Sequence, residues 1–456
     1  MKMEYPHILL LNPWIYDFAA YDFWARPIGL LYLASILKSQ GYKVSYIDCL
    51  DRFHPGLPRR LPVREFGRGP YLKVPVNKPE GLRDIPRRYS RYGIPESLLR
   101  MELNRIPKAE AVLVTSLMTY WYPGVFEVIR IVRQMIKEAP IILGGIYATL
   151  CHEHALKNSG ADYVISGQGE RAIIPLLNSL FGRQVSPLFQ AECPGPAPFF
   201  PEDPDSYPYP AFELQTRIPY VPIETGRGCP FRCAYCASSV LNPKLLRRSP
   251  KNVVNEIEYW HKRYGVLDFP FYDDALLIDP EHHIVPILED VLARGLKVRF
   301  HTPNALHIRN FSHELALLMF RAGFKTVRLG LETAVFGGDR KIDNKVDREE
   351  FEKAVRYLKE AGFSGKQIGA YLLFGLPGQD YRLLELSIRM VRSLGIQPIL
   401  AQYSPIPRTP LWDEAVRVSA YDLSADPIFH NNSIFPCLEG GFSWEKISYF
   451  RGLVRN

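Results

Sequence analysis

Cysteine is scarce in this chain, which has seven in 456 residues, an odd count. Three lie close together, and the other four, Cys49, Cys151, Cys193 and Cys437, are scattered, which argues against the disulfide framework of a secreted protein. No apolar run is long enough to cross a bilayer, and the short run HILLLNP near the start resembles a buried strand more than a signal peptide. These absences predict a cytoplasmic protein without a membrane span.

Two nucleotide-binding patterns are also missing, because neither a Walker P-loop nor a G-x-G-x-x-G after the first strand-like segment is present. Strand-like and helix-like segments nevertheless alternate over the first 180 or so residues, beginning with HILLLNP, GLLYLASILKSQG and YKVSYID. This alternation predicts an α/β fold with a doubly wound, Rossmann-like parallel sheet, which binds ligands at the carboxyl ends of its strands. The glycines at those ends either admit a ligand close to the backbone or only form tight turns.

Positive charge is concentrated in one segment. Residues 52–108 contain 14 Lys or Arg and 5 Asp or Glu, so their net charge of +9 accounts for the whole +8 of the chain. The segment is also rich in proline and aromatics, as in IPRRYSRYGIP. A basic segment of this kind is compatible with binding RNA, docking an anionic cofactor or covering another domain. Because such charge patterns are common to all three roles, they argue only weakly for nucleic acid, which we do not expect as a partner.

Proline marks a boundary in the chain. Eight prolines fall within residues 186–210, a composition typical of a semi-rigid linker. After it, six strand-like segments alternate with five helix-like ones, the pattern of a partial (β/α)6 barrel related to the TIM barrel. We therefore predict an amino-terminal domain over residues 1–185, a linker over 186–216, a barrel over 217–415 and a carboxyl-terminal cover over 416–456.

The three crowded cysteines, Cys229, Cys233 and Cys236, have the spacing C-x3-C-x2-C, in the loop after the first barrel strand. Structural zinc requires four ligands, and no other cysteine lies within 30 residues. A [4Fe–4S] cluster held by three thiolates leaves one iron open to a small molecule. Three buried cysteines without a metal are the alternative, but the glycines and arginines in TGRGCPFRCAYC favour an irregular, functional loop.

This loop resembles that of the radical S-adenosylmethionine superfamily, and the resemblance covers about residues 217–410. In that family the residue before the last cysteine is usually aromatic, as Tyr235 is here. The resemblance implies that S-adenosylmethionine chelates the open iron. An electron from a donor such as flavodoxin or ferredoxin then cleaves it to a 5′-deoxyadenosyl radical that abstracts hydrogen from substrate.

Other strand ends resemble the family's cofactor-binding positions. Asp273 and Asp274, in FYDD, match its acidic element, although a helix N-cap would also explain them. Asn304 in HTPN and Glu332 in GLET resemble residues that hold the ribose or amino-acid part of S-adenosylmethionine. A buried Glu requires a partner, which favours a ligand role for Glu332. Gly375, in LLFGLPGQ, resembles the glycine-rich adenine side.

The amino-terminal domain ahead of such a barrel resembles the cobalamin-binding class of this superfamily. The resemblance implies a corrinoid between the two domains, with its nucleotide tail at the carboxyl edge of the first sheet. The residues placed to cradle that tail are Ser116, Leu117, Gly144, Gly145, Gly167, Gly169 and Glu170. The D-x-H-x-x-G motif that supplies a cobalt ligand in related domains is absent, so the lower ligand is not assigned.

These features predict a cobalamin-dependent radical S-adenosylmethionine enzyme, with methyl transfer to an unactivated centre as the leading reaction. A rearrangement or cyclisation is the alternative within the class, and an iron–sulfur RNA-binding or sensor protein is the alternative outside it. No second three-cysteine set supports a methylthiotransferase. His301, His307 and Cys437 are candidate groups on the substrate side. The sequence does not distinguish a peptide, lipid or small-molecule substrate and assigns no catalytic residue.

Overall fold

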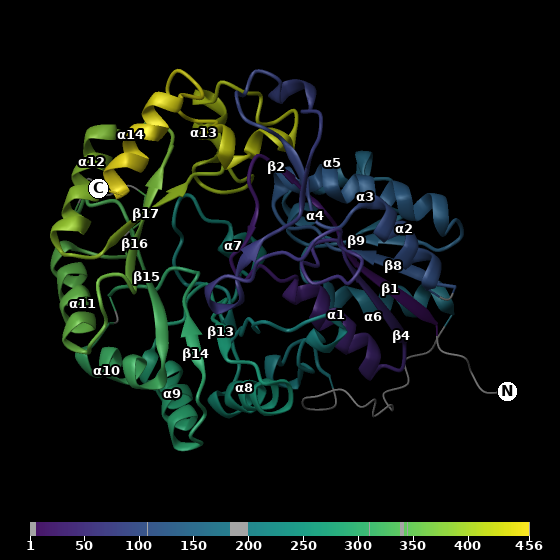
Figure 1. Cartoon of the computed structure of the whole chain (residues 1–456), viewed down its shortest axis with the longest axis horizontal. Helices are drawn as coiled ribbons and strands as arrows, with labels where there is room; N and C mark the ends of the chain where they lie inside the picture. Colours follow the sequence, from purple (N-terminus) through teal and green to yellow (C-terminus); the bar gives the residue numbers. More distant parts are fainter. Residues whose placement is uncertain are drawn as a thin grey trace. The chain divides into compact units, whose positions relative to one another are not determined.

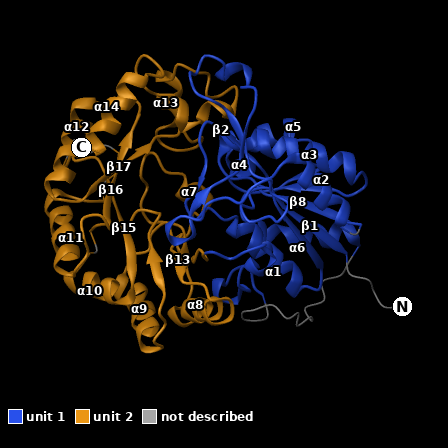
Figure 2. Cartoon of the chain, in the orientation of Figure 1, with its two compact units in different colours: residues 1–219 blue, residues 220–456 orange. Residues whose placement is uncertain are grey.

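The computed structural model describes residues 6–106, 108–182, 199–309, 311–337, 342–343 and 345–455. The chain divides into two compact units, Met1–Pro219 and Tyr220–Asn456 (Figure 2). Each unit has its own parallel sheet, and each is described separately below. Among the described residues, no helix is long and apolar enough to cross a membrane.

Unit 1 is built on a five-stranded parallel sheet with the order β10-β9-β8-β1-β4. Its strands are β1 (His7–Asn12), β4 (Lys43–Asp48), β8 (Ala111–Val114), β9 (Ile141–Leu143) and β10 (Tyr163–Val164). Its longer helices are α1 (Ile28–Ser39), α2 (Glu96–Arg105), α3 (Tyr122–Met135) and α6 (Gly169–Phe181), and α4 (Ile146–Leu150) and α5 (His152–Asn158) are short. This is the predicted doubly wound sheet, although β10 is shorter than the segment ADYVISGQGE from which it was predicted.

The alternation of side chains along β1 explains why the sheet is covered on both faces. Leu9 and Leu11 pack in one apolar cluster with residues of α2 and α3, whereas Ile8 and Leu10 pack in another with residues of α1 and α6. All six residues of β1 are buried, as expected for a central strand between two helical layers. The hydrophobic run HILLLNP, which the sequence predicted to be a buried strand, therefore forms the central strand of this unit.

The basic insertion folds onto unit 1 as small antiparallel sheets. One has the order β2-β7-β6, formed by β2 (Ile15–Asp17), β7 (Ser90–Tyr92) and β6 (Lys73–Pro75). The other pairs β3 (Tyr21–Asp22) with β5 (Gly69–Pro70). In both sheets, a strand near the start of the chain pairs with strands of the insertion. The insertion is therefore an integral part of this unit.

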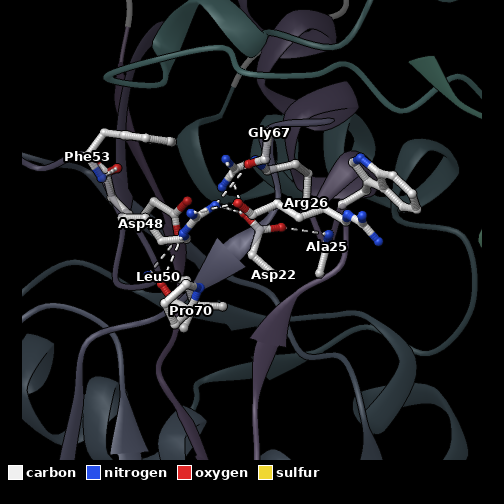
Figure 3. A network of polar contacts seen from close by, with 12 residues as sticks. Asp22, Ala25, Arg26, Asp48, Leu50, Phe53, Gly67 and Pro70 are labelled. Carbon is white, nitrogen blue, oxygen red and sulfur yellow. Dashed lines mark hydrogen bonds and ion pairs between the residues drawn. The ribbon is translucent and has the colours of Figure 1, made fainter. Parts of the chain in front are cut away.

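Buried Arg52 holds the second of these sheets together, and three of its partners, Asp22, Gly67 and Pro70, are labelled in Figure 3. Its guanidinium donates to Asp22 at 2.8 Å and to the carbonyl oxygens of Pro62, Gly67, Arg68 and Pro70. Because the side chains of Arg52 and Asp22 are both fully buried, the ion pair must be well hydrogen-bonded to be tolerated. The contacts to four carbonyl groups meet that requirement and fix the path of residues 62–70.

Other arginines of the insertion and its surroundings lie over aromatic rings of the same unit. Arg91 lies 4.7 Å from the ring centroid of Trp14, Arg87 5.3 Å from that of Phe18, and Arg68 4.9 Å from that of Trp24. Such cation–π contacts stabilise by roughly 0.5–1 kcal/mol at exposed sites. The interleaving of arginine and aromatic residues seen in the sequence is thus used within the protein itself.

Unit 2 contains a second parallel sheet whose strands follow chain order, β13-β14-β15-β16-β17. The strands are β13 (Asp268–Pro270), β14 (Arg299–His301), β15 (Phe324–Glu332), β16 (Ile368–Phe374) and β17 (Gln397–Gln402). A parallel bridge between Ile223 and Phe271 adds the first of the six predicted strand positions. The intervening helices are α8 (Pro250–Tyr264), α9 (Ile284–Ala293), α10 (His313–Ala322), α11 (Arg348–Glu360) and α12 (Tyr381–Ser393).

Helices α9, α10, α11 and α12 lie along the outer side of the curved sheet of unit 2 (Figure 1). Local signals fix several of these helices. Ser249 and Ser312 cap the starts of α8 and α10 with their hydroxyls, and Asp347 forms a capping box with Glu350 at α11. This repeated β–α order is the predicted partial barrel.

The predicted linker precedes the barrel, and the predicted carboxyl-terminal cover follows it. Residues 186–198 of the predicted linker lie outside the described residues, but the rest packs on unit 1, where Ser35 donates to Tyr209 O at 2.6 Å and Phe212 is fully buried. At the other end, α13 (Trp412–Val418) and α14 (Trp444–Arg455) belong to unit 2. Cys437 is buried there beside Leu373, Tyr403 and Ala415.

Candidate active site

The cysteine loop lies between two short antiparallel strands of unit 2, β11 (Gly226–Arg227) and β12 (Leu246–Arg247). Gly228 enters the loop with a φ of +90°, and a Cβ at this position would lie 2.4 Å from the carbonyl oxygen of Lys244. Only glycine satisfies both conditions. The glycine before the first cysteine is therefore required by the close approach of two backbone segments, which sets the start of the loop.

The three thiols lie in a partly buried environment that disfavours charge. Cys233 is buried, and Cys229 and Cys236 are half-buried. Burial raises the pKa of all three thiols, and the pKa of Cys229 reaches about 11, in part because Cys233 and Cys236 are close to it. The backbone N–H of Ser238, the first residue of α7 (Ser238–Leu241), donates to Cys236 Sγ at 3.4 Å. A bound metal ion would overcome this effect of burial, because a thiol that ligates a metal loses its proton and binds as the thiolate.

The donor set fits a cluster better than a single ion. Among the described residues, no three His, Cys, Asp or Glu side chains converge closely enough to hold one metal ion. A four-iron cluster does not need such convergence, because each thiolate binds a different iron. The three half-buried or buried cysteines of one irregular loop are thus a suitable ligand set for [4Fe–4S] and an unsuitable one for zinc.

Tyr235 and Glu332, both predicted cofactor residues, meet through a residue that the sequence did not single out. Lys345 Nζ donates to Glu332 Oε1 at 2.8 Å and to the Tyr235 hydroxyl at 2.9 Å. Burial disfavours the charge on Lys345, but Glu332, Cys233 and Asp343 together outweigh burial and raise the Lys345 pKa. Burial, reinforced by Glu332, raises the Tyr235 pKa well above its usual value. The partner that a buried Glu332 requires is therefore Lys345.

The backbone at Glu332 supports a special placement of its carboxylate. Its φ is +64°, a left-handed conformation that costs a non-glycine residue about 1–3 kcal/mol. The pairing of β15 with β16 shifts register between Gly330 and Glu332. A Cβ on Gly330 would lie 3.2 Å from Lys345 Nζ and 3.3 Å from Glu332 Oε1, so this glycine leaves room for the ion pair.

The carboxylates after β13 are hydrogen-bonded to the cysteine segment. Asp273 accepts from the backbone N–H and the hydroxyl of Thr225, and Asp274 accepts from Ser238 Oγ at 2.6 Å. The Thr225 hydroxyl also lies 2.7 Å from His283 Nε2. The helix N-cap alternative does not apply, because the next helical turn begins at Pro280. Asp273 therefore fixes the segment that precedes the three cysteines, and Asp274 fixes the segment that follows them.

Burial shifts the pKa values of Asp273 and His283, the two titratable partners of Thr225. It raises the pKa of Asp273 to about 7, against the opposing effect of the Thr225 hydrogen bonds. It lowers the pKa of His283 to about 4, and nearby Arg247 and Arg248 act in the same direction. Thr225 and His283 were not predicted from the sequence. Thr225 is 48 positions from Asp273 and 58 from His283, and no local pattern indicates contacts over such separations.

The remaining predicted residues of unit 2 lie at neighbouring strand ends. Asn304, after β14, donates to the carbonyl oxygens of Tyr272 at 2.8 Å and Asp273 at 3.3 Å. Gly375, after β16, has a φ of +89°, and its N–H donates to Gln379 Oε1 at 2.7 Å. Tyr235 packs against the cluster that contains Leu376, so the glycine-rich turn and the cysteine loop adjoin.

Two of the three candidate substrate-side groups have structural roles. His301 is fully buried and bonds to Asp268 at 3.0 Å and Thr326 at 3.2 Å. Cys437 lies in an apolar cluster, where burial raises its pKa to about 12. His307 differs, because its Nε2 lies 3.7 Å from Cys229 Sγ. Of the three candidate groups, His307 alone lies next to a predicted cluster ligand.

In unit 1, the predicted corrinoid-side residues gather at the carboxyl ends of β8, β9 and β10. The set consists of Ser116, Leu117, Gly144, Gly145, Gly167, Gly169 and Glu170. Ser116 Oγ donates to Gly144 O at 2.7 Å, and a Cβ on Gly145 would lie 2.2 Å from Ser116 O. Gly145 is thus required by packing between the two strand ends.

Gly144 and Gly167 behave differently from Gly145. A Cβ on either would meet no atom of the described residues within 4 Å, so packing explains neither glycine; the φ of +87° at Gly167 itself favours glycine, whereas Gly144 has no such requirement. Open space beside a strand end is where a ligand approaches the backbone. Gly169 is a third case, since its Cβ would contact the Leu33 side chain at 3.3 Å. The open positions Gly144 and Gly167 fit a bound group at this edge.

Three consecutive aromatic residues follow β8, Tyr120, Trp121 and Tyr122, and all three pack within unit 1. Tyr120 is buried, Trp121 Nε1 donates to Asp17 at 2.8 Å, and Tyr122 stacks on Tyr147 with ring centroids 5.7 Å apart. Asn12, at the end of β1, donates to Asp48 at 2.7 Å. These contacts account for the trio within unit 1.

Family comparisons agree with this division into two units. The model of the radical SAM superfamily matches residues 223–391, and that of the B12 binding domain matches residues 99–177. Unit 2 therefore carries a radical SAM domain, and unit 1 carries a B12 binding domain. The chain thus combines a radical SAM domain with an amino-terminal B12 binding domain.

The chain is similar to proteins named as methyltransferases and to proteins named as cyclases. An uncharacterized methyltransferase, PH0819, of Pyrococcus horikoshii is 24% identical over 71% of this chain and 74% of its own length. Anaerobic magnesium-protoporphyrin IX monomethyl ester cyclase of Cereibacter sphaeroides is 27% identical over 65% of this chain and 52% of its own. The solved radical S-adenosylmethionine methyltransferase TsrM from Kitasatospora setae shares the fold, with a TM-score of 0.66 at 17% identity over 98% of this chain and 89% of TsrM.

Proposed function

We propose that this protein is a cobalamin-dependent radical S-adenosylmethionine methyltransferase. The observation that carries the proposal is the presence in one chain of a three-cysteine loop suited to an open [4Fe–4S] cluster and a B12 binding domain whose strand ends leave space at Gly144 and Gly167. Cys229, Cys233 and Cys236 would hold the cluster. Bound there, the cluster supplies the electron that cleaves S-adenosylmethionine, and cobalamin supplies methyl-group transfer.

The side chains around the loop have roles that follow from their contacts. Thr225 and Asp273 brace the segment that leads into the cysteines, and Asp274 fixes Ser238, whose N–H faces Cys236. Lys345 and Glu332 place one positive and one negative charge beside Tyr235. The amino-acid part of S-adenosylmethionine carries one charge of each sign, so this pair is matched to it. Asn304 and Gly375 extend the proposed cofactor site along neighbouring strand ends.

The experiment is anaerobic reconstitution of the full chain with iron, sulfide and cobalamin. Binding of about four irons per chain is expected for one cluster. With a reductant, S-adenosylmethionine should yield 5′-deoxyadenosine, and with reduced cobalamin it should also yield S-adenosylhomocysteine, the product left when the methyl group departs. An intact cluster that never yields 5′-deoxyadenosine would overturn the radical-enzyme part of the proposal.

A non-methylating reaction is the second candidate, supported by the similarity to the cyclase of Cereibacter sphaeroides. The same reconstitution separates the two. A cyclase or rearrangement enzyme retains cobalamin and yields 5′-deoxyadenosine, but the methyl group stays on the methionine released by the cleavage, so S-adenosylhomocysteine does not accumulate. The substrate class, whether peptide, lipid or small molecule, is then sought among compounds that stimulate turnover.

A further inference from the structure

His307 occupies an unusual position beside the cysteine loop. Its side chain is buried, and its Nε2 lies 3.7 Å from Cys229 Sγ. Its ring stacks on Phe231, with centroids 4.6 Å apart and planes 16° from parallel. Phe231 belongs to the loop itself, two residues after Cys229. The imidazole is therefore fixed against the loop by stacking as well as by burial.

The backbone on the other side also fixes this histidine. Leu306, the preceding residue, forms a parallel bridge with Leu329 of β15. Its N–H donates to Arg328 O at 2.8 Å, and its carbonyl accepts from the N–H of Gly330 at 3.1 Å. These bonds attach the segment to the central strand of the barrel. His307 is thus a rigidly held group that meets the first cysteine of the loop from a different element.

The polarity of the contact follows from the chemistry of the two atoms. An iron-bound cysteine sulfur carries negative charge and accepts hydrogen bonds, so the ring nitrogen that faces it must be the donor. The other nitrogen, Nδ1, is buried and has no hydrogen-bond partner among the described residues. A neutral imidazole has one N–H, and the geometry places it on Nε2.

We propose that His307 donates an Nε2–H···Sγ hydrogen bond to Cys229 and thereby raises the reduction potential of the cluster. The inference depends on the proposed function, because it requires the [4Fe–4S] cluster. Reduction adds one electron to the cluster and increases the negative charge on its sulfur ligands. A hydrogen bond to a ligand sulfur stabilises that reduced state more than the oxidised one, which is how such bonds tune cluster potentials. His307 is a positioning residue in this role, since it acts through Cys229.

The test is a redox titration of the reconstituted full-length protein, followed by electron paramagnetic resonance. His307→Phe keeps an aromatic ring to stack on Phe231 and removes the N–H. At the wild-type midpoint potential, half of the wild-type clusters are reduced, and we expect the reduced-to-oxidised ratio of His307→Phe to fall several-fold because its midpoint is more negative. His307→Gln restores an N–H donor at a similar reach and should recover most of the wild-type potential.

Controls separate this inference from folding and from the proposed function. His313→Phe, at a partly exposed histidine on α10, makes the same chemical change away from the loop and should leave the potential unchanged. Equal iron content in all variants shows that the cluster is loaded. An unchanged midpoint in loaded His307→Phe would overturn the inference and leave the proposed function intact, whereas wild type that binds no cluster would overturn the proposed function itself. If His307→Phe does not retain iron, His307→Leu, which also lacks the N–H, takes its place: a midpoint more negative than wild type supports the inference, and an unchanged midpoint overturns it.

Discussion

Lys345 Nζ lies 2.8 Å from Glu332 Oε1, and both side chains are less than a tenth exposed. The same ammonium group donates to the hydroxyl of Tyr235, which lies between two of the cysteines. The pair therefore joins the end of β15 to the cysteine loop. A buried ion pair of this kind is costly to break, because removal of one partner leaves an uncompensated charge.

Replacement of Lys345 by Met should lower the free energy of unfolding by about 3–5 kcal/mol, the usual cost of leaving one buried charge unpaired. The measurement is urea unfolding of the metal-free full chain. Lys353→Met is the matched control, because Lys353 forms an exposed pair with Glu349, and loss of an exposed pair should change stability little. The double variant Glu332→Gln/Lys345→Met removes both charges and should recover part of the loss. Equal costs for the two lysine variants would contradict this account.

Serine at Cys233 should abolish cluster binding, so the iron content of the reconstituted protein falls from about four per chain toward zero. Cys229→Ser and Cys236→Ser should behave in the same way. Cys437→Ser serves as the control, because Cys437 lies in an apolar cluster and bonds weakly to Ala415 O at 3.9 Å. It should retain iron and lose only a little stability. Iron analysis and visible absorption after anaerobic reconstitution provide the measurement.

Much of the fold was predictable because single helices separate buried strands, and that order permits few topologies. HILLLNP shows why: its apolar run has no polar face, which indicates a strand buried on both sides, and β1 is such a strand. The division of the basic insertion into antiparallel strands was not predictable. It depends on contacts such as Arg52 with Asp22, which lie 30 residues apart and carry no periodic signal.

The candidate site was predictable only where a motif is local. Cys229, Cys233 and Cys236 stand within eight positions, so their spacing alone indicates a metal site. Lys345 has no such context, because its charged segment KIDNKVD is typical of a solvated loop. One signal did exist: a Glu at the end of an apolar strand requires a counter-charge, and Lys345 meets that need. Which lysine would do so depends on tertiary structure.

A bulky side chain at Gly144 should weaken cobalamin binding without weakening the fold. A Cβ there meets no atom within 4 Å in the part of the chain that the structure describes, so Gly144→Leu should unfold at nearly the wild-type urea concentration. If the nucleotide tail occupies that space, its displacement should raise the cobalamin Kd about tenfold or more, since crowding of a filled site costs roughly 1–3 kcal/mol. Gly452→Leu, at another open position, is the control. Equal cobalamin affinities in the two variants would remove Gly144 from the site.

The two partners of Thr225 should give opposite pH dependences of stability. Burial raises the pKa of Asp273 from 3.8 to about 7, so between these values the folded chain keeps a proton that the unfolded chain has lost. Its contribution to stability is complete at low pH and falls as pH rises, by at most about 1.4 kcal/mol per pH unit. Burial lowers the pKa of His283 from 6.5 to about 4, so there the unfolded chain binds the extra proton and stability rises with pH.

Asp273→Asn should therefore make the free energy of unfolding increase more steeply with pH than in wild type, because the falling contribution of Asp273 is gone. His283→Gln should make it increase less steeply, because the rising contribution of His283 is gone. Both variants keep groups that hydrogen-bond to Thr225, which limits the loss of packing. Urea unfolding of the metal-free chain at several pH values between about 4.5 and 6.5 measures both slopes in the window where the two shifts overlap. Slopes that change in the same direction in the two variants would show that Asp273 is ionised, or His283 charged, in the folded protein.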